Sequence, residues 1–233
     1  MGSTGTPAPP QLSDGEDRKR AAAEAAAALV RYGQRVGLGT GSTVAHLLPA
    51  LAARGLELRC VATSPATERV ARELGLALHS LDQLGELDVA IDGADQVLAD
   101  GWLIKGGGGA HTREKIVAAA AARFVVIASA EKTVAALHAP VPLEILRFGA
   151  QRTLTAIGQA QLRAGAPASP DGNLIADYLG PIEDPRRLAR QLSLQPGVVE
   201  HGLFAPELVS DVLIAGPHGV EHRQLANKRG ADA

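Results

Sequence analysis

Short apolar runs alternate with longer amphipathic segments through the first 130 residues of the chain. The apolar runs end in glycine or polar residues and are predicted to be strands, at 35–39, 57–62, 77–81, 87–92 and 124–128. The segments around them have helical patterns, at 18–32, 42–54, 65–74 and 112–123. Strands that alternate with helices indicate parallel pairing. The pattern therefore predicts an α/β fold, a mostly parallel layered sheet with helices on both faces.

A different pattern begins near residue 141 and predicts a second, smaller α+β unit. Its strands are expected at 141–146, 173–178 and 198–204, and its helices at 153–164 and 185–194. A last apolar run at 211–215 is expected to return to the first sheet. We predict a larger α/β catalytic domain over 18–140 and 208–233, and a smaller α+β domain over 141–207. Residues 1–17 are rich in Pro, Gly, Ser and Thr and are predicted to be a disordered tail.

Composition narrows the possible functions. The 23 Lys and Arg residues against 25 Asp and Glu give a net charge of −2, so no basic excess favours nucleic acid or an anionic membrane as partner. The single cysteine, Cys60, excludes an intramolecular disulfide and is predicted to be a core residue. The histidines lack metal-ligand spacing, so we expect no metal and no cofactor. Neither a secretory signal nor a membrane-length apolar run is visible, so a cytoplasmic location is expected.

Glycine-containing segments follow three predicted strands at their carboxyl ends, where open α/β sheets bind ligands. The first, GLGTGST at 37–43, leads directly into a predicted helix. Its glycines allow close approach of the backbone to an anion, and its amides and the hydroxyls of Thr40, Ser42 and Thr43 can donate to it. It is neither a dinucleotide fingerprint, which needs glycine at 42, nor a Walker loop, which needs lysine before Ser42. We predict a site for one phosphate; the alternative is a tight turn with Ser42 as the helix N-cap.

The second and third segments carry charged groups. A DGAD turn places Asp92 and Asp95 after a buried strand, which suits proton transfer or hydroxyl binding; the alternative is a carboxylate that caps a helix. The third segment puts Lys105 before four glycines and Glu114 in the first turn of the next helix. Because ordering four glycines costs conformational entropy, we interpret the run as a nest of amides for an oxyanion. The alternative is a flexible loop before a solvated helix start.

Taken together, these segments resemble ribose-5-phosphate isomerases of the A type, over residues 18–220. The resemblance rests on runs that occur in the family's order: GLGTGST at 37–43, DGAD at 92–95, KGGGGA at 105–110, TREK at 112–115, DGNLIAD at 171–177 and PGVVEHGLF at 196–204. It implies interconversion of ribose 5-phosphate and ribulose 5-phosphate, in the non-oxidative pentose phosphate pathway, without metal or cofactor. It also implies a larger α/β domain with a smaller α+β domain beside the active-site cleft. A homodimer or homotetramer is expected.

The resemblance further implies roles for individual residues. Glu114 corresponds to the base that moves a proton between C2 and C1 of the sugar. Lys105 and the glycine amides suit the enediolate oxygens, while Asp92 and Asp95 suit hydroxyl binding and ring opening. The implied substrate-binding positions are Thr40, Gly41, Ser42, Thr43, Asp92, Gly93, Ala94, Asp95, Lys105, Gly106, Gly107, Gly108 and Lys132, with Lys19 as a further phosphate ligand.

Three positions depart from the family pattern. Gln96 stands where Glu is usual, His111 where an apolar residue is usual, and Ser129 where Asp is common. With Gln96, one negative charge near the cleft is lost. Other functions remain open: a sugar-phosphate deaminase or lactonase, a non-catalytic sugar-phosphate sensor, or a CoA transferase. A sensor would carry a DNA-binding module and degraded catalytic residues, and a transferase would need a larger chain or a partner.

Overall fold

The computed structural model describes residue 12 and residues 14–225, and its main element is a seven-stranded sheet. The strands lie in the order β14 (Gly219–Gln224), β13 (Asp211–Gly216), β7 (Phe124–Ser129), β4 (Val89–Gly93), β1 (Arg35–Leu38), β2 (Arg59–Ala62) and β3 (Ala77–Leu78). Neighbouring strands pair in parallel, except that β14 pairs antiparallel with β13. The predicted return of a late strand to the first sheet is confirmed by β13. The sequence did not predict β14.

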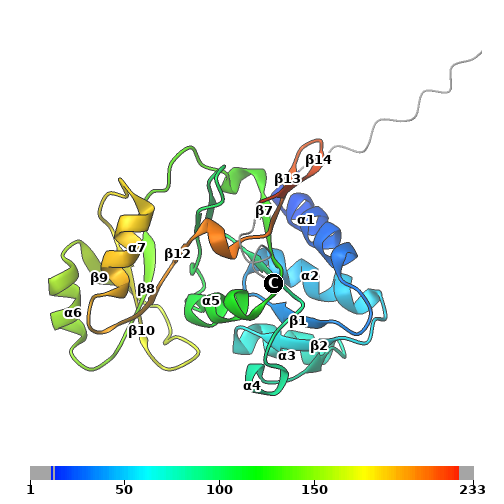
Figure 1. Cartoon of the computed structure of the whole chain (residues 1–233), viewed down its shortest axis with the longest axis horizontal. Coiled ribbons are helices and arrows are strands. Elements are labelled where there is room, and N and C mark those ends of the chain that lie inside the picture. Colours follow the sequence, from blue (N-terminus) through cyan, green and yellow to red (C-terminus); the bar gives the residue numbers. More distant parts are fainter. Residues whose placement is uncertain (1–11, 13, 226–233) are drawn as a thin grey trace, which may run out of the picture.

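Helices cover both faces of this sheet (Figure 1). One apolar core lies between the sheet and α1 (Gly15–Leu29), α2 (Ser42–Ala53) and α3 (Pro65–Glu73). A second core lies on the other face, under α4 (Leu81–Leu84) and α5 (His111–Ala120). Strand β7 is buried at every position, which is typical of a parallel strand covered on both sides. The predicted α/β fold class is confirmed.

Helix α1 begins earlier than the sequence predicts. Asp14 is its N-cap, and the Asp14 carboxylate accepts a hydrogen bond of 2.9 Å from the backbone N–H of Asp17. Residues 15–17 are therefore helical, and the predicted disordered tail is wrong at its C-terminal end; the rest of that tail lies outside the described residues, apart from residue 12 and Asp14. Small side chains let α1 pack closely on α2 and the sheet, because the buried positions of α1 are Ala22, Ala23, Ala26 and Ala27.

A separate antiparallel sheet lies toward the other end of the molecule's long axis (Figure 1). Its strands lie in the order β11 (Val198–His201), β8 (Val141–Ile145), β10 (Leu174–Tyr178) and β9 (Ala160–Leu162). With α6 (Ala150–Ile157) and α7 (Pro185–Ser193), this sheet encloses a third apolar core. A small sheet lies between the two larger ones and contains β12 (Leu203–Phe204), β6 (Leu103–Ile104) and β5 (Gln96–Val97). Two 3₁₀ turns complete the described elements, η1 (Ala130–Lys132) and η2 (Pro206–Leu208).

Two predicted elements are wrong in extent because of local turn signals. The helix expected over 153–164 ends at residue 157, because Gly158 has a φ of +90° that a helix cannot continue through; strand β9 follows. The strand expected over 77–81 ends at residue 78. Ser80 then caps the short helix α4 in a capping box with Gln83.

The strand expected over 198–204 is divided between two sheets at Gly202. A Cβ atom at this position would overlap the carbonyl oxygen of Lys105, so glycine is required by the close approach of the two chain segments. The Lys105 N–H donates to the Gly202 carbonyl oxygen at 2.9 Å. The connection between the two larger sheets is thereby bonded to the segment that carries Lys105.

Candidate active site

The turn after β1 forms one wall of a cleft at the carboxyl ends of the parallel strands. Glycine is required at position 39, because a Cβ atom there would overlap the carboxyl group of Asp92. The Thr40 N–H donates to Asp92 Oδ1 at 3.0 Å, and the Thr40 hydroxyl lies 2.8 Å from the Thr63 hydroxyl. These bonds fix the turn against the neighbouring strands β2 and β4.

Helix α2 begins at this turn without a side-chain cap. Its N-cap is Gly41, with a φ of +118°, and no described side chain bonds to the N–H groups of the first turn. The alternative in which Ser42 caps the helix is therefore wrong, because Ser42 is the first helical residue. Uncapped N–H groups at a helix N-terminus carry partial positive charge and attract anions. The geometry favours a phosphate group here.

A cleft of about 280 Å³ opens beside this helix end. It brings together Glu114 and all of the substrate-binding residues that the sequence predicts, with the exception of Asp92. The residues that line it are Lys19, Thr40, Gly41, Ser42, Thr43, Gly93, Ala94, Asp95, Lys105, Gly106, Gly107, Gly108, Glu114 and Lys132.

Asp92 lies beneath the cleft rather than in its lining, and only 3% of its surface is exposed. Its Oδ1 accepts hydrogen bonds from the N–H groups of Thr40 and Gly93, the latter at 2.7 Å. Its Oδ2 lies 2.9 Å from Nζ of Lys105. Asp92 thus holds both the turn after β1 and Lys105 in place.

Lys105 lies at the centre of a buried ion cluster. Its Nζ donates to the Gly93 carbonyl oxygen at 2.5 Å and lies 3.1 Å from Glu114 Oε2, in addition to the contact with Asp92. Although burial disfavours the ammonium form, the two carboxylates raise the pKa of Lys105 above its usual value. Lys105 is therefore a permanent cation at the cleft.

Glu114 is the group in this cluster that is suited to proton transfer. Burial is the largest cause that raises its pKa to about 8, and repulsion from Asp92 adds to it, against the attraction of Lys105. One cation between two carboxylates cannot neutralise both of them. A carboxyl group whose pKa lies close to neutral pH is an effective general base, because it both takes and returns a proton at that pH.

The glycine run after Lys105 forms the opposite wall. The Gly107 N–H donates to Asp95 Oδ2 at 2.8 Å. Two positions of this run have no room for a side chain. Gly106 has a φ of +101°, and a Cβ atom there would lie 2.7 Å from His111 Nδ1; a Cβ atom on Gly107 would lie 2.9 Å from Asp95 Oδ1. Asp95 is thereby held in the lining of the cleft.

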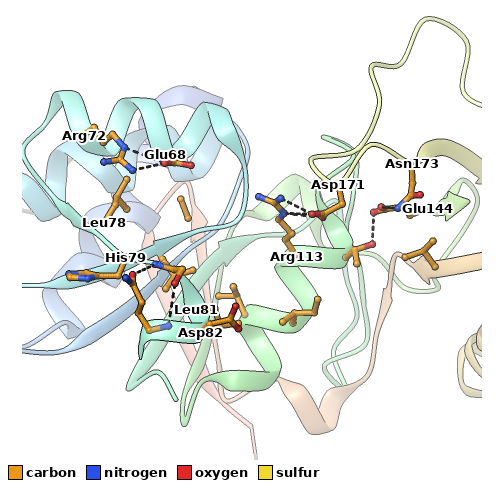
Figure 2. Close-up of a pocket in the computed structure, with 18 residues that line it drawn as sticks. Glu68, Arg72, Leu78, His79, Leu81, Asp82, Arg113, Glu144, Asp171 and Asn173 are labelled. Atoms are coloured by element: carbon orange, nitrogen blue, oxygen red, sulfur yellow. Dashed lines mark hydrogen bonds and ion pairs between the residues drawn. The ribbon is translucent and has the colours of Figure 1, made fainter. Parts of the chain in front are cut away.

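The residues that flank Glu114 are bonded to the smaller α+β unit. The Thr112 hydroxyl donates to Glu144 Oε2 at 2.5 Å. Arg113 Nη2 donates to Asp171 Oδ1 at 2.6 Å, a pair that Figure 2 shows. Glu144 belongs to β8 of the four-stranded sheet, and Asp171 to the loop before β10. The first turn of α5 therefore takes its position from another sheet, and Glu114 with it.

Glu144 is a functional candidate that the sequence did not predict. It is fully buried, and its Oε1 accepts hydrogen bonds from Ser169 at 2.6 Å and from Asn173 at 2.8 Å. Figure 2 shows the bond between Glu144 and Asn173. The available signal was the DGN run at 171–173, to which the resemblance assigned no role. In the structure, Asp171 of this run pairs with Arg113, and Asn173 of the same run donates to Glu144.

A larger cavity of about 730 Å³ lies on the side of α5 that Figure 2 shows, bordered by α3, α4 and the loop before β10. Both arginines that line it are paired with carboxylates, Arg72 with Glu68 at 2.7 Å and Arg113 with Asp171. None of the site residues predicted from the sequence lines this cavity. The chemistry expected from the sequence is concentrated in the smaller cleft.

The three departures from the family pattern lie outside the lining of the small cleft. Gln96 donates to the His138 carbonyl oxygen at 2.7 Å and accepts from the His138 N–H at 2.9 Å, a pair of bonds that a carboxylate could not make. His111 is fully buried, and burial lowers its pKa to about 4, so it is neutral. Ser129 is a buried residue at the end of β7.

Cys60 is confirmed as a core residue. It is fully buried in β2, and burial raises the pKa of its thiol to about 12. Within residues 14–225, no group of three or more His, Cys, Asp or Glu side chains is placed to hold a metal ion. The described part of the chain also contains no helix that is both long enough and apolar enough to cross a membrane.

A cleft at the carboxyl ends of parallel strands, with an uncapped helix end, a buried lysine and a carboxyl base, defines the chain as an α/β enzyme suited to a small anionic substrate. A family model described as Ribose 5-phosphate isomerase A (phosphoriboisomerase A) matches residues 59–219. The chain belongs to this family, and its class is that of the aldose–ketose isomerases. The resemblance found in the sequence is confirmed.

Individual relatives of the family align with this chain over nearly their whole length. The chain is 46% identical over 215 residues to "Ribose-5-phosphate isomerase A" of Methanosarcina acetivorans, which covers 86% of this chain and 91% of that protein. It is 47% identical over 229 residues to the protein of the same name from Agrobacterium fabrum, which covers 91% and 99%. The solved ribose 5 phosphate isomerase A from Neisseria gonorrhoeae superposes with a TM-score of 0.86 at 33% identity, and covers 93% of this chain and 100% of that one.

Proposed function

We propose that the chain interconverts D-ribose 5-phosphate and D-ribulose 5-phosphate through a cis-enediolate, with Glu114 as the carbon base. The observation that carries this proposal is the contact of a buried carboxyl group, whose pKa is about 8, with the permanent cation Lys105 in a cleft that begins at an uncapped helix. An aldose–ketose isomerase needs these three features: a base, a stabiliser for the developing oxyanion, and an anchor for the phosphate.

Substrate binding in this proposal begins at the phosphate. The uncapped N–H groups of α2 and the hydroxyls of the Thr40–Thr43 turn receive it, and Lys132 and Lys19 supply positive charge from the same lining. A solved D-ribose-5-phosphate isomerase with a TM-score of 0.86 to this chain was determined in complex with phospho-erythronic acid, a phosphorylated sugar acid. That complex supports a sugar phosphate as the ligand of this cleft.

The chemical steps follow from the positions of the remaining groups. Asp95, at the cleft edge, exchanges protons with the ring oxygen and with the hydroxyls on C1 and C2, so that the ring opens. Glu114 removes the proton from C2 and returns it to C1. The negative charge that develops on the oxygens meets Lys105 and the glycine amides, which are oriented before the reaction begins. We assign Asp92 to holding Lys105, because its contacts lie beneath the cleft.

The test is an isomerase assay with ribose 5-phosphate, performed with and without a chelator of divalent metals. We expect full turnover in both, and competitive inhibition by phospho-erythronic acid. Loss of activity in chelator that a divalent ion restores would refute the metal-free mechanism. A ligand-bound structure with the phosphate beyond hydrogen-bonding distance of the 39–43 turn would refute the assigned anchor.

Three further properties are part of the proposal. The larger catalytic domain comprises 18–140 and 208–233, with 141–207 as the smaller domain; the separate sheets and apolar cores support this division. A homodimer or homotetramer is supported by the exposed apolar side chains of the smaller domain, and sedimentation would test it. A cytoplasmic location is supported by the buried, unpaired thiol of Cys60, and cell fractionation would test it. The exposed large apolar side chains of the smaller domain are Leu146, Phe148, Leu162, Leu179, Leu194 and Val199.

A further inference from the structure

Arg163 connects the four-stranded sheet to the glycine run of the cleft. It directly follows β9, and its Nε and Nη2 donate to the two carboxylate oxygens of Asp177 at 2.9 and 2.6 Å. Its remaining nitrogen, Nη1, donates to the carbonyl oxygen of Gly107 at 2.9 Å and lies 3.4 Å from that of Gly106. One guanidinium group is thus fixed by a carboxylate on one side and holds two consecutive peptide groups on the other.

The orientation of a peptide carbonyl determines where the N–H of the same peptide group points. In a trans peptide the C=O and N–H bonds point in opposite directions. The Gly106 carbonyl faces Arg163, and the N–H of the same peptide, on Gly107, reaches Asp95 at the cleft. By the same geometry, the Gly107 carbonyl on Arg163 directs the N–H of Gly108 away from Arg163, toward the cleft that Gly108 lines.

The Gly108 N–H is available to a ligand. No acceptor among the described residues takes a hydrogen bond from it. Gly108 faces the phosphate-binding turn across the cleft, since a Cβ atom on it would lie 3.6 Å from Thr40 Cγ2. Within the glycine run, one turn bond runs from the Gly109 N–H to the Gly106 carbonyl oxygen at 3.0 Å. Among the described residues, no bond within the run holds the Gly107 carbonyl oxygen, which instead accepts from Arg163.

We propose that Arg163, held by Asp177, is a positioning residue that orients the Gly106–Gly108 peptides so that the Gly108 N–H donates to the developing enediolate oxygen. This role rests on the isomerase function proposed above. Arginine suits it because its planar fork supplies three separate donors at fixed angles, whereas a lysine ammonium cannot engage both the carboxylate and the two carbonyls in this geometry. The donor is aimed before the substrate arrives, which is the condition for oxyanion stabilisation.

The experiment compares Arg163→Met, Arg163→Lys and Asp177→Asn with the matched control Arg123→Met. Arg123 forms an equivalent bidentate pair with Asp211, at 2.6 and 2.8 Å, next to the amino end of β7 and away from the cleft. Steady-state kinetics with ribose 5-phosphate are measured for all variants, together with inhibition by phospho-erythronic acid and by inorganic phosphate. Thermal unfolding reports the stability of each variant.

For Arg163→Met we expect kcat to fall about 10–100-fold, because displacing one oxyanion donor costs less than the roughly 10²–10³-fold loss on removing it. KM should change less than about threefold, since the phosphate contacts lie on other segments. Binding of phospho-erythronic acid should weaken while that of inorganic phosphate is unchanged. Arg163→Lys should stay impaired, Asp177→Asn should show a smaller loss in kcat, and Arg123→Met should keep wild-type kcat.

Three results would overturn the role of Arg163. The first is a kcat of Arg163→Met within about threefold of wild type. The second is a wild-type kcat in Arg163→Lys. The third is a loss in Arg163→Met that is confined to KM and accompanied by an equal weakening of inorganic phosphate binding. Should Arg163→Met not fold, normal kcat in both Arg163→Lys and Asp177→Asn would overturn it. Absence of turnover in the wild-type protein would instead overturn the proposed function, and this role along with it.

Discussion

Replacement of Asp92 by asparagine should move the pH dependence of catalysis downward. Asp92 Oδ2 and Glu114 Oε2 lie 2.9 and 3.1 Å from the same Lys105 Nζ, so the two oxygens are no more than about 6 Å apart. At an effective dielectric constant near 20, two charges at that distance repel by about 3 kcal/mol. This energy corresponds to a change of about 2 in the pKa of Glu114.

The sign follows from the proposed role of Glu114 as a base. The wild-type kcat/KM should rise with pH through about 8, because the ionised form of Glu114 is the active one. In Asp92→Asn the repulsion is lost and Lys105 remains, so the rise should be centred about 2 pH units lower. The new amide NH₂ lies against the ammonium group and loosens Lys105. The maximal rate is therefore expected to fall, and the midpoint is the quantity to compare.

The assay measures initial rates at low substrate concentration from pH 5 to 10. Asp88→Asn is the matched control, because Asp88 pairs with Arg35 at 3.0 Å before β4, at the opposite end of that strand. The control shares the titration of the substrate phosphate, so the difference between the two variants isolates the enzyme group. An Asp92→Asn midpoint that is unchanged, or higher than in wild type, would refute the electrostatic coupling of Asp92 with Glu114.

Three other substitutions test the site. Glu114→Gln should lower kcat by about 10²–10⁴-fold with little change in KM, and stop exchange of the C2 proton with solvent; more than about a tenth of wild-type kcat would exclude Glu114 as the base. The raised pKa of Glu114 costs the folded state stability as pH rises from about 4.5 to about 8, so the stability of Glu114→Gln relative to wild type, measured by denaturant unfolding, should increase over that interval and then level off. Lys105→Met should slow turnover and move the rise of kcat/KM above pH 8, because Glu114 loses its cation; a midpoint below 8 would contradict this. Glu144→Gln should weaken the bonds to Thr112 and Ser169, destabilise the protein by about 1–3 kcal/mol and lower kcat; unchanged kcat with lowered stability would show that Glu144 does not position Glu114.

The parallel strands of the large sheet and the phosphate-binding turn of the cleft could be predicted from the sequence because their signals are local. Gly39 and Gly41 mark a strand-to-helix turn, and the glycines after Lys105 mark a backbone that approaches other groups closely. The segments at Gly39 and Asp92 follow apolar runs that form the buried parallel strands β1 and β4. The glycine run instead follows the short strand β6, which pairs antiparallel in the three-stranded sheet. Parallel strands bring their carboxyl ends to one edge, so the segments at Gly39 and Asp92 had to meet.

The supporting groups could not be predicted because their partners are distant along the chain. Glu144 lies on the short strand β8 and Arg163 directly follows β9, with no motif around either. Each bonds to a segment at least 32 residues away in the larger unit. Asp92 could be recognised as important, but its burial beneath Lys105 is a tertiary feature. The two-residue strand β6 was missed for a similar reason, since its pairing with β12 depends on contacts far apart in sequence; β5, also missed, pairs with β6.

The chemical reactivity of the single thiol of this protein, that of Cys60, depends on opening of the central sheet. Cys60 is paired through β2 with strands on both sides, and none of its surface is exposed. With a thiol pKa of about 12, only about one molecule in 10⁵ carries the reactive thiolate at pH 7 even when a reagent reaches it. Labelling of the native chain must therefore wait for β2 to separate from its neighbours and for the thiol to regain its ordinary acidity in water. The rate of thiol modification can be followed with and without a sugar phosphate. The difference between the two rates measures how much the bound ligand slows separation of β2 from β1, the strand that leads into the turn at 39–43.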